Sequence, residues 1–72
     1  MGLIDEQMRL NRANDTIESI DSQVLVLKLT DWERRFIRSI RQQIDPHLNS
    51  SPSISEAQDL VFVRIRNRLG IV

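Results

Sequence analysis

Apolar residues recur at helical spacing near the start of the chain. In the segment GLIDEQMRLNR, acidic residues come early and arginines late, an order that suits the dipole of a helix. The pattern predicts a short amphipathic helix whose apolar positions are Leu3, Ile4, Met8 and Leu10. The polar stretch 11–15 is expected to break this helix, which would make residues 1–14 a frayed helical arm.

A second apolar series follows the polar stretch. Asp15 and Glu18 have the spacing of an N-cap with a carboxylate three residues on. The series steps by three, four and three residues through Ile17, Ile20, Val24 and Leu27, which predicts a helix. Branched residues in 23–28 also suit a short strand, and its only available partner is 61–66. We favour the helix and keep the strand pair 23–28/61–66 as the alternative.

Two capped helices are expected in the second half of the chain. Thr30 and Glu33 form a capping box, and so do Ser55 and Gln58. Pro46 is expected to stop the first of these helices by residue 45. The apolar arcs of the two helices comprise Trp32, Phe36, Ile37, Ile40 and Ile44, and then Val61, Phe62, Ile65 and Leu69. We therefore expect the three aromatic residues Trp32, Phe36 and Phe62 to form most of the core volume.

The turn residues and Gly70 support the same assignment of two helices in the second half of the chain. Residues 45–54 combine two prolines, three serines and an Asn, which predicts a loop. Gly70 stands where a left-handed C-cap would end the last helix, and Ile71 could fold back on Ile65. The overall prediction is an all-α bundle of three to four helices, forming one small domain over residues 1–72.

Length and composition narrow the class of protein. The chain has 72 residues and no cysteine, which excludes disulfides, thiolate zinc sites and thiol catalysis. No apolar run approaches the length of a membrane span, and the start lacks the pattern of a signal peptide. We expect a cytoplasmic protein, located in the host cell if it is encoded by a phage.

The charges are balanced overall but segregated along the chain. Net charge is zero, yet residues 1–33 hold seven acidic and three basic groups, and residues 34–72 hold three acidic and seven basic ones. Nine of the ten bases are Arg, which binds carboxylates and phosphates in a bidentate manner. The basic half either faces the acidic half of the same chain or binds an anionic partner. The candidate partner-binding residues are Arg34, Arg35, Arg38, Arg41, Arg64 and Arg68.

Groups that could carry catalysis are scarce. His47 is the single histidine and lies in the proline-containing loop, without a visible orienting partner. The chain has only two glycines, Gly2 and Gly70, and hence no glycine-rich phosphate loop. We expect a protein that is not an enzyme and that holds no metal and no cofactor.

Part of the chain resembles small helical proteins encoded by phages. Residues 29–69 are similar to the helicase-accessory module of T-even phages through Leu29, Thr30, Trp32, Glu33, Phe36, Ser39, Ile40, Gln43, Ser55, Gln58, Val61 and Ile65. The Arg-rich composition departs from the Lys-rich usage of those phages and indicates a phage of a GC-rich host. In size and class the chain also resembles the Xanthomonas-phage protein that binds host RNA polymerase.

These resemblances imply a function as well as a fold. They imply a non-enzymatic regulator that binds host RNA polymerase, inhibits initiation and causes antitermination. The alternative is a nucleic-acid-binding or helicase-accessory module in which Arg34, Arg38 and Arg41 contact phosphates.

Overall fold

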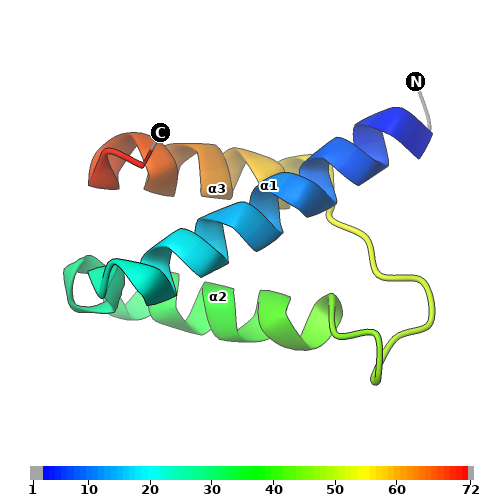
Figure 1. Cartoon of the computed structure of the whole chain (residues 1–72), viewed down its shortest axis with the longest axis horizontal. Coiled ribbons are helices and arrows are strands. Elements are labelled where there is room, and N and C mark those ends of the chain that lie inside the picture. Colours follow the sequence, from blue (N-terminus) through cyan, green and yellow to red (C-terminus); the bar gives the residue numbers. More distant parts are fainter. Residues whose placement is uncertain (1–2, 72) are drawn as a thin grey trace.

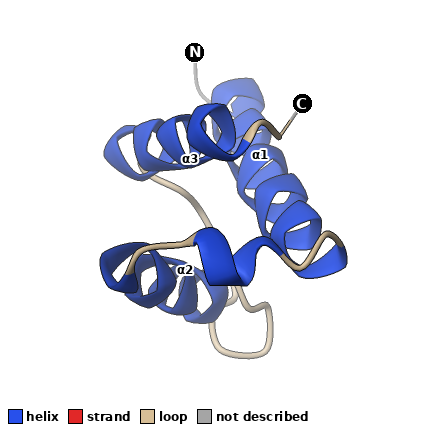
Figure 2. Cartoon of the chain, turned by 90° about the vertical axis from the view of Figure 1, so that its left-hand side faces the viewer, coloured by secondary structure: helices blue, strands red, loops and turns tan. Residues whose placement is uncertain are grey.

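The computed structural model describes residues 3–71, with side chains from residue 5 onward. Its elements are α1 (Leu3–Ser22), the 3-10 helix η1 (Leu25–Lys28), α2 (Asp31–Gln43) and α3 (Glu56–Leu69). Within this range there are no strands, which confirms the all-α prediction (Figure 2). The strand alternative is wrong, because 25–28 form η1 and 61–66 lie within α3.

The N-terminal region is one helix and not two. The predicted break at 11–15 is wrong, since α1 continues through it to Ser22, and Asp15 is therefore not an N-cap. The polar stretch contains Ala13, which is fully buried, and is followed by the equally buried Thr16. Tertiary packing on this small-residue face outweighs the weak helix propensity of the flanking polar residues. The described part of 1–14 is therefore the first part of α1.

The turn after α1 reverses the expected burial of the next residues. Val24 has left-handed backbone angles (φ 54°, ψ 41°), which end the periodicity of α1. Val24 and Leu27 were expected on the buried face but are 65% and 79% exposed, whereas Leu25 and Leu29 are buried. The sequence pattern failed here because the chain changes direction within its own apolar series.

Both predicted capping boxes are present. The Glu33 N–H donates to Thr30 Oγ1 (3.1 Å), and the Thr30 N–H donates to Glu33 Oε1 (2.8 Å). Ser55 and Gln58 make the same reciprocal pair at the start of α3. At its other end α3 stops at Gly70, whose φ of 72° is the left-handed conformation that glycine adopts without a Cβ clash.

The core lies between the three α-helices, which form a triangle when viewed end-on (Figure 2). Buried apolar residues come from every element and from the loop, at Ala13, Ile17, Ile20, Leu25, Leu29, Ile37, Ile40, Ile54, Phe62 and Ile65. Phe36 is only partly buried, and Trp32 is 59% exposed. The prediction that Trp32 belongs to the core is therefore wrong. In its place, Ile54 brings a branched side chain from the loop.

Polar contacts fix α3 against the other two helices. Arg12 Nη1 lies 2.6 Å from Asp59 Oδ2, which joins α1 to α3. Arg9 Nε donates to the Ile54 carbonyl oxygen (2.7 Å), which holds the loop against α1. The amides of Gln43 and Gln58 donate to each other (2.8 and 2.9 Å), joining the end of α2 to the start of α3. Figure 1 shows that α1 crosses both helices and that α2 and α3 run in opposite directions. None of the described helices is both long enough and apolar enough to cross a membrane.

Candidate functional site: an arginine-lined pocket

The structure divides the arginines of α2 between two places. All four are exposed, as the sequence pattern predicted. Arg34, Arg38 and Arg41 line one pocket between the end of α1, η1 and α2. Arg35 instead lines a cavity on another part of α2, together with Trp32. The four arginines are therefore not a single binding surface.

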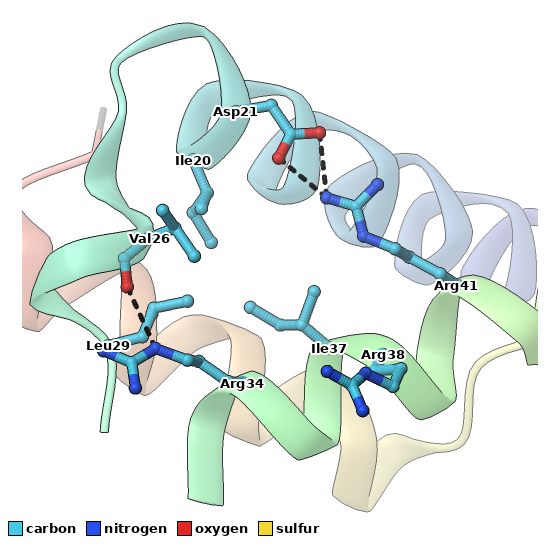
Figure 3. Close-up of a pocket in the computed structure, with 8 residues that line it drawn as sticks. All are labelled: Ile20, Asp21, Val26, Leu29, Arg34, Ile37, Arg38 and Arg41. Carbon is cyan, nitrogen blue, oxygen red and sulfur yellow. Dashed lines mark hydrogen bonds and ion pairs between the residues drawn. The ribbon is translucent and has the colours of Figure 1, made fainter. Parts of the chain in front are cut away.

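The pocket has an apolar floor and a charged rim (Figure 3). Its volume is about 220 Å³. Ile20, Leu29 and Ile37 form the floor, and their side chains point into the space enclosed by the arginines. Val26 contributes a further apolar wall from η1, and Asp21 lies at the end of α1. The left-handed backbone of Val24 turns the chain after α1. After this turn, Val26 of η1 lines the same pocket as Arg34 of α2.

Two of the three arginines are held by the protein itself. Arg41 Nη2 lies 2.7 and 2.8 Å from the two carboxylate oxygens of Asp21. Arg34 Nη1 lies 2.9 Å from Asp31 Oδ1, and Arg34 Nε donates to the Val26 carbonyl oxygen (3.3 Å). Arg38 makes no ion pair with any residue in 5–71. Asp21 and Asp31, both in the acidic half of the chain, therefore form ion pairs with two of these arginines, and Arg38 has no such partner in residues 5–71.

The other two candidate residues lie on α3 and outside this pocket. Arg68 pairs with Glu33 and donates from Nη1 to the Lys28 carbonyl oxygen (3.1 Å), so it ties α3 to the start of α2. Arg64 is exposed and forms no ion pair within the described chain. Arg68 therefore has a structural role, and Arg64 belongs to a different surface.

The arrangement is suited to binding an anion. Asp21 and Asp31 pair with two of the three guanidinium groups, which leaves a formal charge of plus one, on Arg38, above an apolar floor. His47 is exposed in the loop between α2 and α3. Among the residues described, no group of three or more His, Cys, Asp or Glu side chains could hold a metal ion. The chemistry that the pocket offers is recognition of a carboxylate or phosphate with an apolar neighbour.

Sequence reasoning missed two parts of this site. Asp21 lies 20 residues before Arg41, so local charge patterning could not pair them. Val26 was assigned to a helix or a strand, and neither assignment would place it beside Arg34. The cluster of branched residues in 23–28 was the one available signal that this segment was unusual.

Comparison with known proteins gives no match. No protein-family model, curated protein or solved structure matches this chain. The resemblance to phage proteins therefore stays a prediction from the sequence.

Proposed function

We propose that the protein is a non-enzymatic regulator that binds an acidic site on a larger protein through the arginine-lined pocket. The observation that carries this proposal is Arg38, a guanidinium without an ion-pair partner in residues 5–71, on the rim of a pocket with an apolar floor. Arg binds carboxylates in a bidentate geometry, and it is enriched at protein interfaces.

The size of the pocket favours one side chain over a free ligand. Drug-sized ligands and cofactors occupy cavities of about 300–1,000 Å³, and this pocket holds about 220 Å³. An Asp or Glu side chain, with an apolar neighbour from the same partner, suits both the volume and the charge. A macromolecular partner is therefore a better fit than a small metabolite.

The surroundings of the pocket supply the apolar contacts that an interface requires. Val24 and Leu27 lie on the turn that carries Val26 and are largely exposed. Arg34 and Arg41 are already held by Asp31 and Asp21, so less side-chain entropy is lost when a partner binds. A buried apolar centre with arginines around it is the usual composition of a protein–protein contact.

The identity of the partner comes from the sequence resemblance. We propose host RNA polymerase, with inhibition of initiation and antitermination as the effects. The alternative is a nucleic-acid-binding or helicase-accessory module with phosphate contacts from Arg34, Arg38 and Arg41. It is less favoured because a chain of phosphates needs several free cations, whereas the pocket offers one, Arg38, which matches a single carboxylate.

Affinity capture with matched variants tests the proposal. The bait is the whole chain, as the wild type, as Arg38→Glu and as the control Arg35→Glu, a residue of the same helix that does not line the pocket. The lysate is bacterial and treated with nuclease, and bound proteins are identified by mass spectrometry. We expect polymerase subunits with the wild type and with Arg35→Glu, and loss of these subunits with Arg38→Glu.

Two results would count against the proposal. Equal recovery by wild type and Arg38→Glu would show that the pocket is not the binding surface. Recovery of a different protein that depends on Arg38 would keep the binding function and exclude RNA polymerase.

A further inference from the structure

A second surface is built around the exposed tryptophan. Trp32 stacks on Phe36, with ring centroids 5.4 Å apart and an interplanar angle of 9°. Phe36 in turn packs against the buried Phe62, with ring centroids 5.2 Å apart and an interplanar angle of 59°. Trp32 is 59% exposed even though Phe36 covers one of its faces. The ring is therefore held in place from behind, and its other face is available.

Polar groups surround this ring. A cavity of about 400 Å³ beside the stack is also lined by Arg35, Ser39, Ile40 and Gln58. Arg35 forms no ion pair within the part of the chain that is described. The cavity therefore combines an aromatic wall, one unneutralised cation and neutral hydrogen-bonding groups.

Trp32, Arg35 and Phe36 line this cavity together, and we call these three residues the aromatic shelf. Arg64 on α3 is exposed and does not line the cavity.

We propose that the aromatic shelf binds single-stranded nucleic acid, with one base on the free face of Trp32 and an adjacent phosphate on Arg35. An open ring face suits a flat base, and a guanidinium group suits the phosphate beside it. A base in a duplex is already stacked on its neighbours, so the shelf selects single strands. The shelf uses a different arginine from the pocket, so this inference does not depend on the proposed function.

The chain contains its own reporter for this contact, because Trp32 is its single tryptophan. An oligothymidylate is titrated into the whole protein at about 0.01 M salt, where the Debye length is about 30 Å. We expect saturable quenching of Trp32 emission. For one phosphate on a single strand, the logarithm of the affinity should fall with the logarithm of salt concentration with a slope of about −0.7.

Variants are compared by the anisotropy of a dye-labelled oligothymidylate. Trp32→Ala should lower affinity about 5- to 150-fold, the loss expected for one stacked base. Trp32→Phe keeps an aromatic face and should restore most of it. Arg35→Gln should remove most of the salt dependence. Lys28→Gln, which removes one charge from an exposed residue that lines neither the pocket nor the shelf, should leave affinity and slope unchanged.

Three outcomes would overturn the inference. The first is absence of quenching at low salt. The second is unchanged affinity of Trp32→Ala, with its fold verified by circular dichroism. The third is equal quenching by polyglutamate or inorganic polyphosphate, which carry charge but no bases. None of these results bears on the capture experiment with Arg38→Glu, so the two proposals fail separately.

Discussion

The fully buried hydroxyl of Thr16 gives the sharpest stability prediction. Thr16 Oγ1 donates to the Arg12 carbonyl oxygen (2.6 Å) and accepts from Arg66 Nη1 (3.0 Å), so it links α1 to α3. Thr16→Val keeps the shape of the side chain and removes both interactions. Because Arg12 is inside α1, its carbonyl oxygen keeps a backbone partner in the helix. The loss therefore falls on Arg66.

The size of the effect follows from that single contact. Hydrogen bonds to charged groups contribute about 1.5–3 kcal/mol. Arg66 is half-buried and can recover some hydration, so the lower end applies. We expect Thr16→Val to reduce the free energy of unfolding by about 1.5 kcal/mol, which corresponds to about 6–12 °C in Tm for a domain of this size.

A double-mutant cycle isolates the contact. Urea unfolding of the wild type, Thr16→Val, Arg66→Met and the double variant is followed by far-ultraviolet circular dichroism. The double variant should be little less stable than either single variant, with a coupling energy of about 1–1.5 kcal/mol. Additive effects, or a Thr16→Val variant as stable as the wild type, would refute the link between the two helices.

Two further substitutions test the placement of exposed and buried residues. Phe62→Ala should cost about 3–5 kcal/mol in thermal or urea unfolding because Phe62 is fully buried. Trp32→Ala should reduce the free energy of unfolding by no more than about 2 kcal/mol. A loss as large as that of Phe62→Ala would indicate that Trp32 is a core residue. Val24→Gly should stabilise the protein by about 0.5–1 kcal/mol in urea unfolding, because it relieves a left-handed branched residue. Destabilisation by Val24→Gly would contradict the backbone geometry of the turn.

Predictions from sequence motifs that span about one helical turn were reliable. The capping boxes at Thr30 and Ser55, and the glycine at 70, each depend on a few neighbouring residues, and all three are confirmed. The end of α2 before Pro46 follows from a steric rule between adjacent residues. These features define α2 and α3 almost completely.

The failures share a different cause. Ala13 and Thr16 are fully buried, and Thr16 accepts a hydrogen bond from Arg66 of α3. Nothing near these residues in the sequence indicates this tertiary packing, so the polar stretch was predicted to break the helix. Trp32 has the correct helical phase for the core, but it lies at the first turn of α2. There it stacks on Phe36 instead of entering the core. Periodicity predicts the side of the helix on which a side chain lies, whereas burial also depends on whether another element of the fold packs against that side.

The sequence predicted that the candidate site is rich in arginine, but it did not predict which residues come together in it. The arginines of α2 were identified from the sequence, but their division into a pocket and a shelf depends on η1 and α3. Arg68 was expected to bind a partner, and in the structure it pairs with Glu33. That pairing joins residues 35 positions apart, beyond the reach of any local pattern.

The packing of α1 on α3 has a consequence for how the protein is made in the cell. These two helices are the first and the last that the structure describes, and the buried residues Phe62 and Ile65 belong to the last one. While the ribosome is still making the loop, the parts of the apolar faces of α1 and α2 that α3 covers in the folded protein are exposed. Closing so long a segment carries an entropic cost that only the final contacts offset. A chain stalled before residue 56 should therefore be a substrate for chaperones and proteases, and folding should begin only after α3 is synthesised.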